Sequence, residues 1–321
     1  MISVALATFN GERFVEKQLK SILHQTLPVD EVVICDDRST DNTVEICRRF
    51  IEDNGLDNAW HIFQNENNIG FCLNFYEAIE RCHGDYIFIC DQDDEWFPEK
   101  VKIMVDTMKF HPEIMVLSSR YDVINENSEV IKSSGVTYLS DKNDGSLEYL
   151  TADSFIGCSY VRGFSLCISS EIKPYIKKID LKSLLAHDWL LCMLGCCYGK
   201  TAILNKRLVH YRYHLDNVSL SAMNKKNRVR DIKKRISGIA QSIEGHKYIL
   251  SIILDEKTSK TIERFIAFEK KRLDFLTFKK FSVYLSLLGK LKYYNRYYKG
   301  KGFRVYIGDF LYAYSSGRRL K

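Results

Sequence analysis

Three aspartates crowd together in the segment 86–96, which reads YIFICDQDDEW. Asp91, Asp93 and Asp94 follow directly on the apolar run 86–90. Crowded carboxylates raise one another's pKa, so their negative charge needs to be offset. Mg²⁺ and Mn²⁺ prefer oxygen ligands, and Mg²⁺ is usually held by one or two carboxylates together with substrate phosphates. The segment therefore predicts a Mg²⁺ or Mn²⁺ site that shares its ion with a phosphorylated substrate.

The spacing of the acids suggests a division of roles. Alternate side chains of an extended segment point to the same side, so Asp91 and Asp93 can face one ligand. We predict that Asp91 and Asp93 face one metal, or that one of them binds the metal and the other a sugar hydroxyl. Asp94 is offset by one residue and is expected to contact groups around the ligand. A bare D-x-D occurs by chance in many chains, and its place after an apolar strand is what makes it informative.

Alternating strand and helix signals precede this segment. Short apolar, β-prone runs predict four strands, and apolar residues at helical spacing lie between them. The strands are expected at 2–9, 31–35, 60–64 and 86–90, and the helices at 14–23, 39–50 and 73–82. This order predicts a parallel sheet with helices on both faces, in which ligands bind at the carboxyl ends of the strands.

Three of these strands end in polar residues, at positions 8–10, 36–37 and 91–94. Because parallel strands end at one edge of the sheet, we expect the three clusters to converge there. Further along the chain, the pattern predicts short strands within 112–150, a strand pair over 155–169 and a late strand at 208–214. A helix is expected at 189–198, directly after His187 and Asp188. A largely helical region follows from 223.

The composition is that of a folded soluble protein: 321 residues, 45% hydrophobic and 27% charged. The opening MISVALATFN lacks the basic stretch of a secretory signal. The longest apolar run, 189–198, is shorter than the roughly 20 residues that span a bilayer. The 10 cysteines show no paired C-x-x-C spacing, so we expect reduced thiols and a cytoplasmic protein.

The charge divides unevenly along the chain. Residues 223–321 hold 25 Lys and Arg against 8 Asp and Glu, whereas the rest of the chain is acidic. Residues 225–236 place apolar side chains at helical spacing among basic ones, which predicts contact with an anionic membrane surface. The alternatives are a helical cap on the catalytic domain and a dimerisation element. No nucleic-acid-binding motif accompanies the positive charge, so we expect no nucleic-acid partner.

Four motifs together resemble the family 2 glycosyltransferases, which are inverting enzymes of the GT-A fold. They are SVALATFNGERF, VVICDDRSTDNT, NIGFCLNFYEAI and GDYIFICDQDDEW, in the family's order and spacing. The resemblance is close over about residues 1–110 and looser to about 220. CDQDDEW, HDW and YRYH most resemble a rhamnosyltransferase-like bacterial branch. The implied organisation is a GT-A catalytic domain over 1–220, with a nucleotide-binding half to about 110 and an acceptor half after it, and a basic helical region over 221–321.

The resemblance implies roles for individual residues. The motif that lines the base and ribose is matched by Thr8, Asn10 and Glu12. The acid that contacts the base is matched by Asp37, with Asp36 beside it. The motif near the ribose and diphosphate is matched by Asn68, Gly70 and Asn74. Asp91 and Asp93, with Asp94 next to them, match the acids that bind sugar, diphosphate and metal. Asp188 matches the catalytic base, although His187 replaces the glutamate that usually precedes it. His214 matches a histidine near the diphosphate or metal. Beside the resemblance, Trp96 and Trp189 are candidates either for sugar-stacking platforms or for core or site-wall residues.

The implied reaction is metal-dependent transfer of a sugar, from dTDP-rhamnose or a UDP-hexose, to a glycan or polyprenyl-linked acceptor. Such a reaction would serve bacterial surface polysaccharide synthesis, at the cytoplasmic face of the cell membrane. An acceptor hydroxyl needs one carboxylate to take its proton, and Asp188 suffices for an inverting reaction. The non-catalytic alternatives are Asp188 as a helix N-cap and His214 as a solvated strand-end histidine. Arg162 and Arg212 are candidates for phosphate contacts or for surface salt bridges. The alternative functions are a non-catalytic nucleotide-sugar-binding module, a phosphatase and a nucleotidyltransferase.

Overall fold

The computed structural model describes residues 1–131, 142–157, 161–176, 186–214, 231–297 and 302–314. The chain forms two compact units. The first comprises Met1–Thr151, Tyr160–Lys182 and Ala186–His214, and the second comprises Ala152–Ser159, Ser183–Leu185 and Leu215–Lys321. Each unit has its own core.

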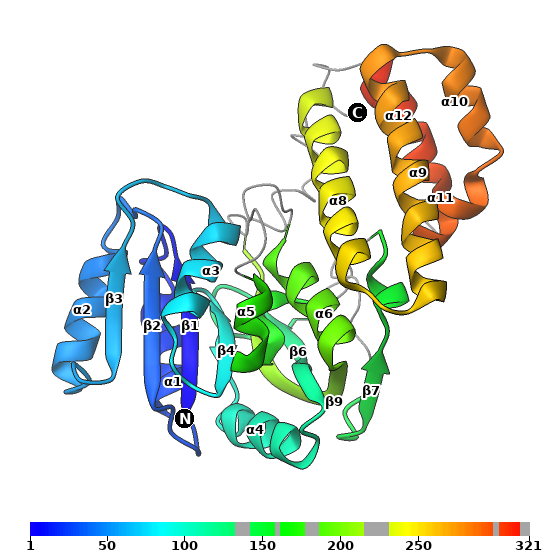
Figure 1. Cartoon of the computed structure of the whole chain (residues 1–321). Helices are drawn as coiled ribbons and strands as arrows, with labels where there is room; N and C mark the ends of the chain where they lie inside the picture. Colours follow the sequence, from blue (N-terminus) through cyan, green and yellow to red (C-terminus); the bar gives the residue numbers. More distant parts are fainter. Residues whose placement is uncertain (132–141, 158–160, 177–185, 215–230, 298–301, 315–321) are drawn as a thin grey trace. The chain divides into compact units, whose positions relative to one another are not determined.

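The first unit is built on one mixed sheet with the strand order β3-β2-β1-β4-β8-β6-β9-β5, and β7 also pairs with β9 (Figure 1). The strands are β1 Ile2–Thr8, β2 Glu31–Asp36, β3 Trp60–Gln64, β4 Tyr86–Asp91, β5 Glu95–Trp96, β6 Ile114–Ile124, β7 Leu147–Leu150, β8 Leu166–Ser169 and β9 Lys200–Arg212. The flanking helices are α1 Val15–Leu23, α2 Thr43–Asp53, α3 Phe71–Arg81, α4 Lys100–Phe110, α5 Lys173–Ile176 and α6 His187–Tyr198.

The four predicted N-terminal strands form the parallel half of this sheet. β1 pairs in parallel with both β2 and β4, and β2 pairs in parallel with β3. All six residues of β2 are buried, as expected for a strand that is covered on both faces. The crossovers β1-α1-β2 and β3-α3-β4 run in opposite directions along the sheet, so right-handed connections put α1 and α3 on opposite faces. The predicted α/β fold class is confirmed.

The second half of the sheet departs from the predicted pattern in two places. Among the described residues of the predicted strand pair over 155–169, only β8 is a strand. The described residues before it form 3₁₀ turns at Ala152–Phe155 and Gly163–Ser165. The apolar residues there are buried but do not form a strand. β-prone residue types indicate burial as much as strand structure, which is why the prediction was wrong here. β9 starts at Lys200, well before the predicted 208. Its pairing with β6 shifts register beside Asn205 and Lys206. That irregularity interrupts the apolar pattern that marks a strand.

The second unit is helical, as predicted for the region after 223. Its helices are α8 Ile232–Ile252, α9 Glu256–Phe278, α10 Phe281–Leu288, α11 Leu291–Tyr297 and α12 Gly302–Tyr314. Buried aromatic rings hold them together, and Tyr284 of α10 stacks on Tyr306 of α12 with ring centroids 4.3 Å apart. No helix in the described ranges is long and apolar enough to cross a membrane.

Candidate active site

The polar clusters that end β1, β2 and β4 meet at the carboxyl edge of the parallel strands, as predicted. The pairing register sets Thr8 opposite Asp36 and Ala7 opposite Asp91. Gln92 reinforces this meeting, because its side-chain amide donates to the Phe9 carbonyl at 2.9 Å and accepts from the Phe9 N–H at 2.8 Å. Gln92 was not among the predicted site residues, and its two bonds tie the acidic loop to the end of β1.

Asp36 and Asp37 hold the loops of this edge in place. Asp36 is fully buried and accepts from the hydroxyl groups of Thr8 (2.9 Å) and Ser39 (2.5 Å). The Asp37 carboxylate accepts from the backbone N–H groups of Ile69 and Gly70, at 2.7 and 2.8 Å. Both carboxylates are therefore bound to protein donors, and Asp37 shapes the loop that leads into α3.

The neighbouring loop after β2 is held by the exposed residues of the first motif. The Asn10 side-chain oxygen accepts from the Thr40 N–H at 2.9 Å, and the Glu12 carboxylate accepts from the Asn42 N–H at 3.0 Å. Asn10 has a φ of 49° and Arg38, at the end of β2, a φ of 65°. Non-glycine residues in this left-handed region are uncommon and cluster at functional sites, so both positions mark this edge.

The third motif divides between the surface and the interior. Asn68 is exposed and donates its side-chain amide to the Asp37 carbonyl at 3.1 Å, and Gly70, with a φ of 87°, precedes the first residue of α3. Asn74 is buried instead. Its amide donates to the Cys35 carbonyl at 2.7 Å and its oxygen accepts from Asn65 at 2.9 Å. Asn74 thus ties α3 to β2, and the structure places it beneath the edge.

The three aspartates after β4 form the densest group of negative charge at this edge. Each of Asp91, Asp93 and Asp94 offers an oxygen, and these atoms lie within 4.8 Å of one another. Burial, with repulsion from Asp93, raises the pKa of Asp91 to about 8 and raises the pKa of Asp94 well above its usual value. One Asp94 oxygen, Oδ2, is buried with no hydrogen-bond partner in the described part of the chain. Close, under-satisfied carboxylate oxygens suit a divalent cation of the Mg²⁺ or Mn²⁺ type.

Arg212 anchors the acidic loop from below. Its side chain is fully buried, its Nε donates to the Asp93 carbonyl at 2.9 Å, and its guanidinium pairs with Glu95. Its backbone N–H donates to Asp94 Oδ1 at 2.9 Å. Because this side chain is fully buried, Arg212 is neither available to contact a phosphate nor part of a surface salt bridge. His214, two residues later, lies with its Nε2 2.8 Å from Asp93 Oδ2, so it touches the acid group through Asp93.

Two further cations lie close enough to the acids to change their pKa. Lys100 is buried, its Nζ donates to the Phe164 carbonyl at 2.9 Å, and burial lowers its pKa to about 8. Its charge opposes the rise in the pKa of Asp91 and Asp94. The Arg162 guanidinium acts in the same direction on the pKa of both Asp91 and Asp188. Arg162 therefore lies near the acid group and Asp188 together.

Asp188 lies in the first turn of α6. Ala186 occupies the N-cap position with no side-chain capping bond, so the N-cap alternative for Asp188 is wrong. Asp188 Oδ1 accepts from the Trp189 N–H at 2.6 Å. Burial raises the pKa of Asp188 to about 6, against the opposing effects of that bond and of Arg162. A carboxyl with this pKa can take up and release protons near neutral pH.

His187 contributes no charge beside Asp188. It is buried, it stacks on Phe75 with ring centroids 4.0 Å apart, and burial lowers its pKa to about 3. Neither of its ring nitrogens has a hydrogen-bond partner among the described residues. The neutral ring takes the place of the expected glutamate as an apolar support for the start of α6. Trp189 is half-buried beside it, whereas Trp96 is buried in the core.

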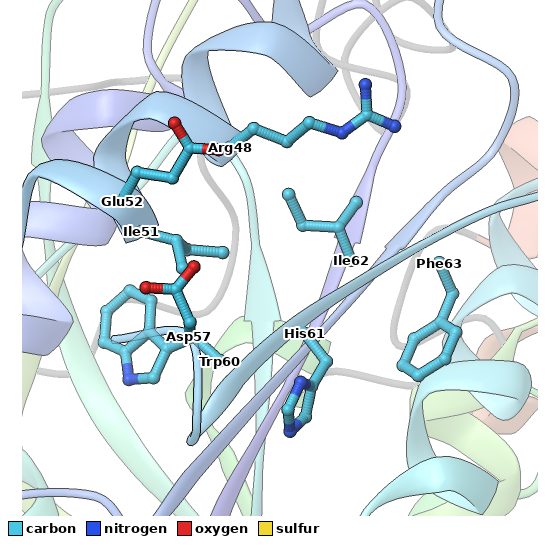
Figure 2. A pocket seen from close by; sticks show the side chains of 8 residues that line it. All are labelled: Arg48, Ile51, Glu52, Asp57, Trp60, His61, Ile62 and Phe63. Carbon is cyan, nitrogen blue, oxygen red and sulfur yellow. The ribbon is translucent and has the colours of Figure 1, made fainter. Parts of the chain in front are cut away.

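A separate shallow pocket of about 340 Å³ lies beside the edge strand β3 (Figure 2). Its lining side chains come from β3 and α2 and from Asp57 between them: Arg48, Ile51, Glu52, Asp57, Trp60, His61, Ile62 and Phe63. None of the predicted site residues lines it. The candidate active site is therefore the carboxyl edge with its acids.

Comparison with known proteins agrees with this location. The family described as Glycosyl transferase family 2 matches residues 3–167, which include β1 to β4, the acid group and Arg162. The dTDP-rhamnosyl transferase RfbG of Shigella flexneri is 30% identical over 221 residues, which cover 66% of this chain and 72% of the relative. The chain belongs to glycosyl transferase family 2. It is a glycosyltransferase.

Other similar proteins support the same family and fold. The UDP-Glc:alpha-D-GlcNAc-diphosphoundecaprenol beta-1,3-glucosyltransferase WfgD of Escherichia coli is 23% identical over 76% of this chain and 87% of its own. S. aureus TarS 1–349 in complex with UDP-GlcNAc has a TM-score of 0.60 at 17% identity, over 92% of this chain and 79% of that one. The mannosyltransferase PcManGT of Pyrobaculum calidifontis, in complex with GDP-Man and Mn2+, has a TM-score of 0.57 at 13% identity, over 97% and 86%. These structural likenesses establish the GT-A fold of the transferase.

Proposed function

We propose that this glycosyltransferase moves a sugar from dTDP-rhamnose to a hydroxyl of a glycan or polyprenyl-linked acceptor, in a metal-dependent reaction that inverts the anomeric carbon. A UDP-hexose is the second candidate donor. The observation that carries the proposal is the group Asp91, Asp93 and Asp94 at the strand edge, with Asp188 near enough to raise the pKa of Asp91. A metal-binding group and a separate base are what such a transfer needs.

The nucleotide binds, in this proposal, across the carboxyl ends of β1 and β2 within residues 1–110. The exposed Asn10, Glu12 and Asn68 contact the base and ribose, while Thr8, Asp36, Asp37, Gly70 and Asn74 support that surface through their bonds to the backbone and to one another. Residues 111–220 supply the acceptor side, where Asp188 and Trp189 lie. We assign Asp37 and Asn74 a supporting role because their polar side-chain atoms already bind protein groups.

The metal would be held by Asp93 and Asp91, with Asp94 as a further oxygen and His214 next to Asp93. A bound Mg²⁺ or Mn²⁺ supplies positive charge that stabilises the diphosphate leaving group. The protein's own residues do the rest: Arg162 adds a cation near the same acids, and Arg212 and Gln92 fix the loop. Asp188 takes the proton of the acceptor hydroxyl as its oxygen attacks the anomeric carbon.

The relatives' names support this choice of donor and acceptor. RfbG is named a dTDP-rhamnosyl transferase, and it is 30% identical to this chain. WfgD is named for a UDP-Glc donor and a diphosphoundecaprenol-linked acceptor. A rhamnose donor and a lipid-linked acceptor would suit a role in bacterial surface polysaccharide synthesis. A lipid-linked acceptor would also bring the protein to the cytoplasmic face of the cell membrane, as a monomer or a homodimer.

A donor screen tests the proposal. The protein is incubated with dTDP-rhamnose, UDP-glucose, UDP-GlcNAc or GDP-mannose, each with Mn²⁺ or with EDTA, and nucleotide release and thermal shift are measured. We expect the largest response to dTDP-rhamnose, and only in the presence of the metal. A response to UDP-glucose alone would favour the second donor, and no response to any of the four would contradict the proposal.

Replacement of Asp93 tests the metal site. Asp93→Ala removes one carboxylate from the acid group, so the Mn²⁺ concentration that gives half-maximal activity should rise at least about tenfold. The measurement is nucleotide release across a Mn²⁺ titration. Asp122→Ala is the matched control, since Asp122 of β6 lies outside the group and pairs with Arg207 at 3.3 Å. An unchanged titration in Asp93→Ala would remove Asp93 from the metal site.

The pH dependence of transfer should report the ionisation of Asp188. The base acts only when deprotonated, and burial raises its pKa to about 6. At saturating Mn²⁺ we therefore expect kcat/KM to fall about tenfold per pH unit below 6 and to level off above about 7. A kcat/KM that is constant between pH 5 and 7 would contradict this ionisation.

A further inference from the structure

The outward face of α10 carries an apolar stripe that the second unit leaves exposed. Phe281, Leu285 and Leu288 are 53%, 51% and 47% exposed, and their spacing of four and three residues puts them on one side of the helix. Tyr284 and Leu287 on the other side are buried. α10 is thus apolar on both faces, and the rest of the unit covers only one.

The sequence around this stripe is basic. Residues 275–308 contain 8 Lys and Arg and no Asp or Glu. Phe278, at the end of α9, is 65% exposed, and Lys280 Nζ lies 5.8 Å from its ring centroid. We call the following exposed residues the α10 surface: Phe278, Lys279, Lys280, Phe281, Leu285, Leu288 and Lys292.

Within the described residues, the basic helix predicted over 225–236 exposes less apolar surface to a membrane than α10 does. Positions 225–230 lie outside them. In α8, Arg235 pairs with the buried Asp309 at 2.7 Å, Ile232 and Ile236 are half-buried, and Ile239 is buried. The apolar side of α8 is therefore used within the unit. Figure 1 shows α10 on the side of α9 and α12 away from α8.

The charge and size of the α10 surface favour an anionic lipid bilayer as its partner. A second copy docked by two-fold symmetry would set the same lysines against one another, and like charges there oppose association. A helix of eight residues is only about 12 Å long, which is short for a stable protein interface of more than about 1,000 Å². On a bilayer, by contrast, apolar side chains enter the boundary of the acyl chains while the lysines meet the headgroups.

We propose that the α10 surface docks this protein on an anionic phospholipid bilayer, with Phe281, Leu285 and Leu288 inserted at the interface. This rests on the proposed function in one respect, since a polyprenyl-linked acceptor would lie in the same bilayer. Docking is peripheral and reversible, because a short helix with a few lysines anchors far more weakly than a membrane-spanning helix. It should therefore weaken as salt screens the lysines.

The test is co-sedimentation of the full-length protein with phosphatidylcholine vesicles, with and without 30% phosphatidylglycerol, at 0.1 M and 0.5 M NaCl. We expect binding to the anionic vesicles at low salt only. The double variant Phe281→Glu/Leu285→Glu should bind them at least about tenfold more weakly. The matched control is Phe110→Glu/Leu254→Glu, which makes the same two exchanges at exposed positions outside the α10 surface and should bind as the wild type does.

Two further measurements separate this proposal from its alternatives. Vesicle binding needs no sugar donor, and nucleotide release is measured without vesicles, so the docking proposal and the proposed function can each fail alone. Equal loss of binding in both double variants would overturn the proposal. So would vesicle binding that is the same with and without phosphatidylglycerol. So would a wild-type dimer that Phe281→Glu/Leu285→Glu converts to a monomer, because the surface would then join two copies of the chain.

Discussion

Asp188→Asn should reduce the kcat of sugar transfer by about 10²–10⁴-fold while donor binding stays within a few-fold of the wild type. The amide is as large as the carboxyl and its oxygen can still accept from the Trp189 N–H, so the start of α6 is preserved. What is lost is the ability to take a proton from the acceptor hydroxyl. The measurement is steady-state transfer to a glycan or lipid-linked acceptor, with donor affinity determined separately by calorimetry.

The electrostatics of the site predict how Asp188→Asn affects Mn²⁺ binding, and this separates loss of the base from a general loss of activity. The negative charge of Asp188 helps to raise the pKa of Asp91. Its removal reduces the competition of protons for Asp91 but also removes a negative charge that attracts the cation, so the apparent affinity for Mn²⁺ should stay within a few-fold of the wild type. Asp106→Asn is the control, since Asp106 is exposed on α4 and pairs only with Lys102 at 2.7 Å among the described residues. Transfer that survives in Asp188→Asn would show that another group is the base.

The parallel half of the fold follows from local sequence pattern. β1, β2 and β4 come from short, largely buried apolar runs that end in polar residues, so these strands and their common edge could be predicted without knowing any contact. The acids at 36–37 and 91–94 were found in this way. The sequence alone did not predict the long-range partners of these acids. Asp37 bonds to N–H groups 32 and 33 residues away, and Arg212 bonds to a carbonyl 119 residues away.

Residue type also misleads where burial changes a side chain's chemistry. Arg212 was expected at a phosphate or on the surface, yet its side chain is fully buried and bound to backbone carbonyls. His187 was expected to replace an acidic neighbour of Asp188, yet burial keeps it neutral. Nothing in the sequence singled out Lys100, yet it is buried close enough to Asp91 and Asp94 to oppose the rise in their pKa. In each case, a neighbour distant in sequence sets the solvent exposure of the group, and exposure decides its charge.

Asp309→Ala should destabilise the second unit by about 3–5 kcal/mol, because it removes one of the carboxylates that pair with a buried guanidinium. The Asp309 carboxylate of α12 is fully buried and accepts from Arg272 of α9 at 2.7 and 2.9 Å. It also accepts from Arg235 of α8 at 2.7 Å and from the Tyr294 hydroxyl of α11 at 3.0 Å. One carboxylate thus joins four helices. Without it, the buried Arg272 keeps its ion pair with Glu269, 2.7 Å away.

The measurement is denaturant unfolding followed by proteolysis within residues 231–314, and Asp274→Ala is the control. Asp274 also lies on α9, and the control removes the same charge, but at an exposed position. Burial alone would raise the pKa of Asp309, yet Arg272 and Arg235 hold it below its ordinary value of 3.8. A carboxyl whose folded pKa is depressed stabilises the fold above its unfolded pKa, and this contribution is lost as the pH falls through the folded pKa. The difference between Asp309→Ala and wild type should therefore be full at pH 7 and shrink below about pH 4. Equal midpoints for Asp309→Ala and Asp274→Ala at pH 7 would mean that the apolar contacts of the helices hold the unit without this network.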